Sequence, residues 1–109
     1  MKNINIIKKN HEFQSIIGNK RFIKTKGFVI YFKKNDLNRF RYGVSVGKKM
    51  GNAVLRNRVK RQVRSMIYEL LNDQKEKSYD VVLMARIMIL DKSYEENLED
   101  LRKSLLLIK

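Results

Sequence analysis

The segment from Lys48 to Arg64 carries the residues most suited to chemistry with a ligand. Seven of its 17 residues are Lys or Arg and none is acidic, so its partner must supply negative charge. Gly51 tolerates a positive φ, and the side chain of Asn52 can accept a backbone N–H of a first helical turn. The pair therefore predicts a turn and an N-cap, with a helix beginning at about Ala53.

A helix from about Ala53 to Asn72 separates apolar from basic side chains. At about 100° per residue, one arc of roughly 120° collects Leu55, Val59, Val63, Met66, Ile67 and Leu70. The opposite side collects Asn57, Lys60, Arg61 and Arg64, with Arg56 at the border. Like charges four residues apart repel, and the first downstream carboxylate is Glu69. A phosphate ligand would relieve this repulsion, although the solvent-exposed face of any amphipathic helix would show the same pattern.

Few side chains are available for catalysis or metal binding. The chain has no cysteine, which excludes disulfides and thiolate metal sites, and its one histidine, His11, is expected at the surface near a helix start. The acidic residues outside the basic segment have surface or capping explanations: Asp80, Asp91, Glu95, Glu96, Glu99 and Asp100. We therefore predict no catalytic residue and no metal site on the protein itself.

Composition points to a globular protein that binds a polyanion. The 109 residues, 43% of them hydrophobic, suit one domain spanning 1–109, and the net charge is +14. Nucleic acid and an anionic membrane surface both satisfy this charge. Apolar runs such as residues 105–108 are too short to span a membrane, and no signal peptide is visible. We expect a cytoplasmic protein.

The remaining pattern predicts an α+β fold in the order αβββαβα, a small central sheet packed by helices. A first helix runs from its cap Asn10 to about Ile17, and strands cover about 21–25, 27–32 and 39–46. Residues 33–38 should close a hairpin between the second and third strands, and 73–78 should form a charged loop. A strand buried on both faces is expected over Tyr79–Ala85. The last helix spans about Ser93 to Ile108, with Ser93 and Glu96 as a capping box.

Several motifs resemble the protein subunit of bacterial ribonuclease P. The run from Arg41 to Lys49, continued by 51–54 and by Arg56-Asn57-Arg58-Val59-Lys60-Arg61 with Arg64, matches the signature of that family over about 24 residues. Weaker similarity includes Lys8-Lys9-Asn10 with Phe13-Gln14, and 28–31. The resemblance implies a left-handed βαβ crossover, whereas general rules predict a right-handed one.

The resemblance also implies two RNA-binding surfaces. One docks on the catalytic RNA subunit and is made by Lys48, Lys49, Arg56, Asn57, Arg58, Lys60, Arg61 and Arg64. The other is a cleft for the single-stranded 5′ leader of precursor transfer RNA, lined by Phe13, Ile17, Val29, Tyr31 and Arg86. Ile17 stands where the family has a second aromatic, and Ile87-Met88-Ile89 replaces the family's Lys-Pro-Ala. In that family the protein is the accessory subunit of an endoribonuclease, and Mg²⁺ is bound mainly by the RNA. No small-molecule substrate is implied.

Other classes of nucleic-acid protein fit part of the pattern. A structural RNA-binding protein of the ribosomal type would have the same size and charge, and only the specific motif argues against it. The sequence shows no clear helix-turn-helix pair, which argues against a DNA-binding module. A membrane-surface helix fits less well, since the helix around Arg64 belongs to a predicted globular core.

Overall fold

The computed structural model describes residues 6–74 and 77–108, with all their side chains except that of Asn72. Of the predicted loop 73–78, residues 75 and 76 lie outside this description. The elements, in chain order, are α1 (Asn10–Gly18), β1 (Phe22–Lys24), β2 (Phe28–Lys34), β3 (Arg41–Ser45), the 3-10 helix η1 (Lys48–Met50), α2 (Ala53–Gln74), β4 (Tyr79–Ala85), the 3-10 helix η2 (Ile87–Asp91) and α3 (Tyr94–Leu106). The predicted α+β order is confirmed.

The four strands form one sheet in the order β1-β2-β4-β3. Strand β4 pairs antiparallel with β2 and parallel with β3. The predicted hairpin between the second and third strands is therefore wrong, because β4 lies between them. The physical reason is burial: Val81, Val82 and Leu83 are all fully buried, and a strand that is apolar on both faces is most stable at the centre of the sheet.

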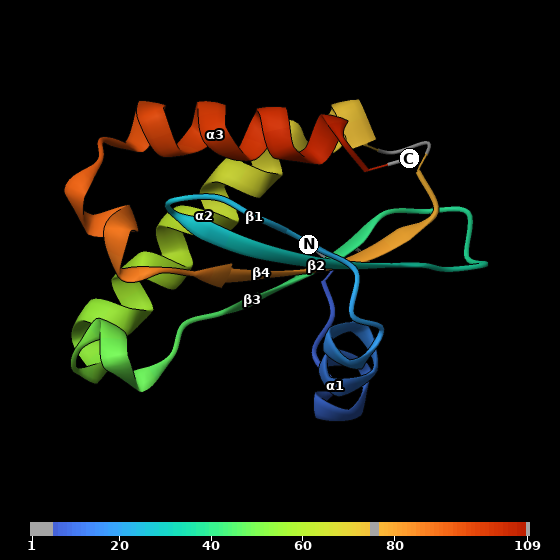
Figure 1. Ribbon diagram of the computed structural model, residues 1–109, viewed down its shortest axis with the longest axis horizontal. Coiled ribbons are helices and arrows are strands. Elements are labelled where there is room, and N and C mark those ends of the chain that lie inside the picture. The colour runs from blue at the N-terminus through green and yellow to red at the C-terminus, as the bar shows by residue number, and fades with distance from the viewer. Residues whose placement is uncertain (1–5, 75–76, 109) are drawn as a thin grey trace.

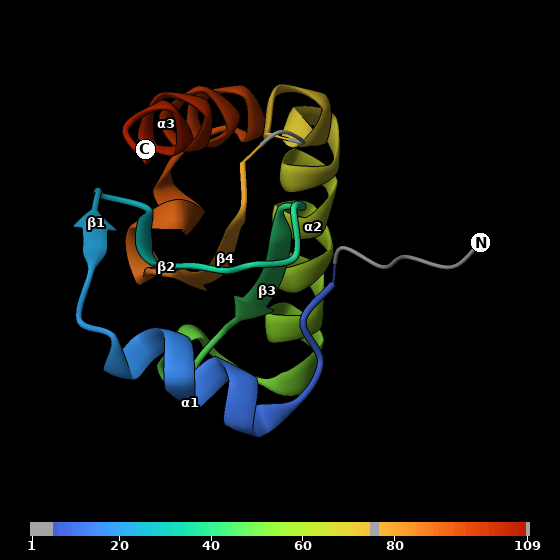
Figure 2. The same cartoon turned by 90° about the vertical axis from the view of Figure 1, so that its right-hand side faces the viewer.

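Helices cover both faces of the sheet. In Figures 1 and 2, α2 and α3 lie on one face and α1 lies on the other. Viewed with α2 in front of the sheet and β3 and β4 pointing upward, β4 lies to the left of β3, so the crossover through α2 is left-handed (Figures 1 and 2). The handedness implied by the family resemblance is thus the one observed, against the general rule.

Alternation in β2 divides its side chains between the two faces. Phe28, Ile30 and Phe32 are buried in the main core with α2 and α3. Val29 and Tyr31 lie on the opposite face, toward α1, and are half-buried. On α2, five of the six residues of the predicted apolar arc are buried and Leu55 is partly buried. The apolar face of this helix therefore fixes its basic residues on the outside.

The helix ends differ in part from expectation. Asn10 is the first residue of α1 rather than its cap, which is Lys9 and has no side-chain capping bond. At α3 the predicted capping box is present, with Ser93 Oγ accepting from the Glu96 amide and Glu96 Oε1 accepting from the Ser93 amide. Residues 87–91 form η2, which was not predicted, and Ile89 anchors it in the core.

Candidate nucleic-acid interface

The start of α2 is set by Gly51 and Asn52. Gly51 has φ of 147°, a backbone conformation that favours glycine, and a Cβ there would also meet Leu55 Cδ2 at 2.8 Å. The side-chain Oδ1 of Asn52 accepts the Leu55 amide at 2.9 Å, which is the predicted N-cap bond. These contacts fix the rotation and start of the helix and hence the direction of every basic side chain on it.

The predicted docking residues form one basic surface over η1 and α2. We use "basic surface" for Lys48, Lys49, Arg56, Asn57, Arg58, Lys60, Arg61 and Arg64. Arg56 and Lys60 are partly buried, and the others are exposed. Lys48 and Lys49 belong to η1, which precedes the N-terminus of α2 and is anchored by the buried Met50. The structure therefore places these residues on η1 and along α2, while their binding role stays a prediction.

In the described part of the chain, no acidic side chain forms an ion pair with a residue of the basic surface. Over residues 6–74 and 77–108, the ion pairs join Arg41 to Glu12 and Asp80, and Arg102 to Glu99. Glu69, the first carboxylate after the basic segment, instead accepts a hydrogen bond of 2.6 Å from the Tyr94 hydroxyl. Burial of Tyr94, together with this bond, raises its pKa above the ordinary value. The charge of the basic surface is thus available to an external anion.

On the α1 face, Phe13 sits directly on the backbone of β3. A Cβ built on Gly43 would lie 2.5 Å from Cζ of Phe13, so only glycine leaves room for the ring. Ile17 and Tyr31 belong to the same apolar cluster, whose buried members are Ile7, Ile16 and Val82. We call the surface lined by Phe13, Ile17 and Tyr31 the α1 cleft. All three side chains are half-buried, so each retains accessible apolar surface.

The other two predicted cleft residues lie farther along the sheet. Val29 is paired in register with Met84 of β4, which is paired in turn with Ser45 of β3. All three are half-buried, and they form a second row of side chains parallel to the one that α1 covers. Arg86 follows β4 and donates from Nη1 to the Thr25 carbonyl at 2.5 Å, so it braces the turn before β2. Neither Val29 nor Arg86 joins the cluster around Phe13.

The α1 cleft is continuous with the basic surface. One hollow of about 370 Å³ is lined by Phe13, Gly43 and Arg64 among others. A second, of about 280 Å³, is lined by Phe13, Val44–Val46 and Lys60. Lys60 and Arg64 are four residues apart on α2, so they reach the same side of the helix. The spacing of Lys60 and Arg64 can be read from the sequence. The position of α1, which brings Phe13 next to these two residues, cannot.

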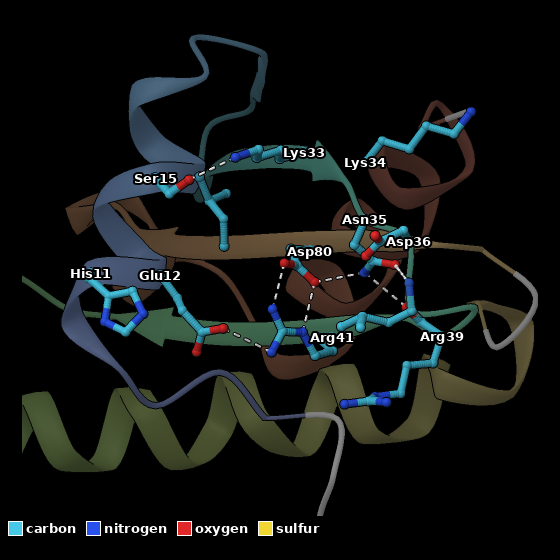
Figure 3. A pocket seen from close by; sticks show the side chains of 12 residues that line it. His11, Glu12, Ser15, Lys33, Lys34, Asn35, Asp36, Arg39, Arg41 and Asp80 are labelled. Carbon is cyan, nitrogen blue, oxygen red and sulfur yellow. Dashed lines mark hydrogen bonds and ion pairs between the residues drawn. The ribbon is translucent and has the colours of Figure 1, made fainter.

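A larger hollow, lined on α1 by His11, Glu12 and Ser15, has a different character. Its volume is about 900 Å³, and Figure 3 shows Arg41 between Glu12 and Asp80 inside it. Arg41 donates to both oxygens of Asp80, at 2.9 and 2.7 Å, and contacts Glu12 at 3.1 Å. The hydrogen bonds that Arg41 donates to Asp80 are the main reason that the pKa of Arg41 is raised. Asn35 also donates to Asp80 at 2.7 Å.

This network corrects one prediction. Asp80 was expected at the surface, but it is buried and paired with Arg41. Because Glu12 precedes Phe13 on α1, the Arg41 network ties α1 to β3 and β4 and so holds one wall of the α1 cleft. Here the cation is neutralised by internal acids, whereas on the basic surface it is not. The Arg41 network inside this hollow is accordingly a structural joint between α1 and the sheet.

Across residues 6–74 and 77–108 there is no group of three or more His, Cys, Asp or Glu side chains placed to hold a metal ion. In that same part of the chain, no helix is both long enough and apolar enough to cross a membrane.

Comparison with known proteins identifies the family. The family model described as Ribonuclease P matches residues 1–109. The chain belongs to the ribonuclease P protein family. Ribonuclease P protein components at high identity include that of Mesoplasma florum, 52% identical over 103 residues and covering 94% of each chain, and that of Bacillus mycoides, 43% identical over 107 residues and covering 97% of this chain and 89% of the relative. The family places the chain in an endoribonuclease that processes transfer RNA.

Solved structures of ribonuclease P proteins have the same fold. A Staphylococcus aureus RNase P protein mutant with defective mRNA degradation activity superposes with a TM-score of 0.84, at 33% identity over 94% of this chain and 86% of that one. The Thermotoga maritima RNase P protein in complex with 1-(4-fluorophenyl)-2-thiourea gives a TM-score of 0.80, at 27% identity over 90% of this chain and 94% of that one. The α+β assignment is therefore supported independently of the sequence pattern.

Proposed function

We propose that this chain binds the RNA subunit of ribonuclease P through its basic surface and holds the 5′ leader of precursor transfer RNA in its α1 cleft. The observation that carries the proposal is the contact between two unlike surfaces: an uncompensated basic helix whose Lys60 and Arg64 line the same hollows as Phe13. Family membership supplies the identity of the RNA partners. The leader-binding role of Val29 and Arg86 is part of the same proposal.

The basic surface suits a structured RNA. Arginine guanidinium groups match phosphate oxygens in a bidentate fork, and they stay charged at every physiological pH. Asn57 is exposed beside them and offers both a donor and an acceptor for a ribose or a base edge. Docking by this surface would place the adjoining α1 cleft close to the RNA that performs the reaction.

The α1 cleft suits a single strand of variable sequence. Every base has a flat π-face, so aromatic side chains such as Phe13 and Tyr31 accept any of them without reading hydrogen bonds. Ile17 supplies apolar contact but no ring. The leader would continue over the second row of the sheet, where Val29 and Met84 are half-buried. The protein then contributes substrate affinity rather than reacting groups.

Phosphodiester hydrolysis is assigned in this proposal to the RNA subunit and its Mg²⁺. Among residues 6–74 and 77–108 no three His, Cys, Asp or Glu side chains are placed to hold a metal ion, and Glu12, Asp80 and Glu99 are engaged by arginines. Both RNA partners are cytoplasmic in bacteria, so we place the chain there.

Reconstitution tests the proposal. The chain is combined with a bacterial ribonuclease P RNA, and cleavage of precursor transfer RNA is measured at low Mg²⁺ with and without the protein. We expect faster cleavage with it, and tighter binding of precursor than of mature transfer RNA. Substitution of the exposed Arg61 by Ala should reduce both the stimulation of cleavage and the affinity for precursor transfer RNA. Lys103→Ala on α3 serves as a control, because it removes the same charge. No stimulation by the protein would overturn the proposal, and equal affinity for unrelated structured RNAs would favour a ribosomal type of protein.

A further inference from the structure

An aromatic pair lies at the far edge of the sheet from α2. Phe22 of β1 is paired in register with Tyr31 of β2, so both side chains project from the α1 face. Their ring centroids are 5.7 Å apart and the ring planes are inclined by 47°. Tyr31 lines the α1 cleft, and Phe22 therefore continues the aromatic surface of the cleft onto the edge strand.

Packing within the chain does not account for this position of Phe22. Its side chain is 53% exposed, although the neighbouring Ile23 packs against the main core. A short polar side chain would satisfy an edge strand as well and would avoid exposed apolar area. Single exposed apolar residues are common, so exposure alone does not define a site. The register with a cleft residue is what distinguishes Phe22 from them.

The charge around Phe22 indicates the occupant. Residues 20–26 contain four cations and no acid, and all four cations are exposed: Lys20, Arg21, Lys24 and Lys26. Across the described residues none of the four takes part in an ion pair. Lys24 follows Phe22 by two positions on the strand, so it projects from the same face of the sheet. Arg21 lies over the ring of Phe32 at 4.8 Å, on the main-core side, which leaves the three lysines without such a contact. A flat apolar ring near lysines that no internal acid neutralises is complementary to a nucleotide, whose base stacks and whose phosphate is anionic.

We propose that Phe22 and Lys24 form an additional nucleotide-binding position on β1, where the Phe22 ring stacks on a base of the single-stranded leader. This inference rests on the proposed function of the α1 cleft. Because the basic surface adjoins β3 and β1 is the opposite edge of the sheet, this nucleotide lies farther from the cleavage site than those at Phe13 and Tyr31. The position depends on a residue that the sequence motif does not include.

Leader length provides the test. The reconstituted holoenzyme is titrated with precursor transfer RNAs whose leaders are shortened one nucleotide at a time. For wild type, affinity should fall in steps as each contact is lost. Phe22→Ala should weaken binding of the longest leaders about fivefold, the lower end of what a stacked base contributes, and should leave the shortest leaders unaffected. Phe22→Tyr should retain the wild-type profile, and Phe22→Leu should behave like Phe22→Ala because it keeps apolar area without a ring.

Controls separate the possible outcomes. Tyr68 is an equally exposed aromatic on α2, 59% exposed, and Tyr68→Ala should leave the dependence on leader length unchanged. If wild type distinguishes long from short leaders and Phe22→Ala does so equally well, the inference is wrong while the proposed function stands. A loss of the same size for every leader length would also overturn it, since Phe22 would then act through the fold. If wild type itself ignores the leader, the proposed function fails and the inference with it.

Discussion

Replacing Gly43 with Ala would test the packing of the Phe13 ring against the backbone of β3. The new Cβ would lie 2.5 Å from Cζ, 2.9 Å from Cε1 and 3.2 Å from Cε2 of the Phe13 ring. Carbon atoms in contact are normally about 3.5–4.0 Å apart, so the ring must move by about 1 Å. Gly43 does not have a positive φ, and the backbone accepts alanine without strain. The whole effect therefore acts through one ring.

The expected magnitudes follow from this displacement. Overpacking of this kind destabilises a protein by about 1–3 kcal/mol, and the reduced entropy of the unfolded chain returns about 0.4–1 kcal/mol. We expect a net loss of about 1–2 kcal/mol in the free energy of unfolding. The displaced ring should also lose its stacked base, which weakens leader binding by about 1–3 kcal/mol, or roughly 5- to 150-fold in the dissociation constant.

A double-mutant cycle with Phe13→Ala is the assay. Unfolding in urea gives stability, and the ratio of precursor to mature transfer RNA affinity in the holoenzyme gives leader binding. Without the ring, Gly43→Ala should be neutral or slightly stabilising, so the two substitutions should couple by at least about 1 kcal/mol. Gly47→Ala is the matched control, because a Cβ there meets nothing within 4 Å. Equal losses from Gly43→Ala in both backgrounds would refute the reasoning.

Three other predictions concern the salt dependence of RNA binding, the Arg41 network and the cap of α3. If about five phosphates are engaged, a plot of log affinity for the RNA subunit against log salt concentration should have a slope of roughly −3.5 to −4.5. Arg61→Ala should reduce the magnitude of this slope by about one. A slope near zero would contradict the electrostatic account. Asp80→Asn removes the carboxylate that holds Arg41 and should lower the free energy of unfolding by about 2–3 kcal/mol in urea, whereas Asp36→Asn, exposed at the same hollow, should change it by less than about 0.5 kcal/mol. Ser93→Ala breaks the capping box of α3 and should lower stability by about 1 kcal/mol, and an unchanged urea midpoint would show that the cap contributes nothing.

Local patterns predicted the elements well because their causes are local. The period of 3.6 placed Val59, Val63 and Met66 on the buried face of α2. Caps at Asn52 and Ser93 were predicted from residue type alone and are present. Each of these features depends on residues within a few positions of one another.

Features that depend on distant residues were not predicted. Sheet order is set by which strands pair across dozens of residues, and the turn-like sequence 33–38 suggested a local hairpin that does not form. The contact of Phe13 with Gly43 joins residues of α1 and β3, and Asp80 meets Arg41 only because β3 and β4 are parallel neighbours. The pairing of Phe22 with Tyr31 was likewise not predicted, because it depends on the register between β1 and β2.

The central place of β4 affects the order in which the chain can fold during synthesis. Until residues 79–85 leave the ribosome, β2 and β3 have no common neighbour, and β1 with β2 can form only an isolated hairpin, which is marginal in water. The chain that emerges before β4 nevertheless contains every cation of the basic surface. A nascent chain arrested before Tyr79 should therefore remain sensitive to protease and bind polyanions without selectivity, and both properties should change together once β4 is released.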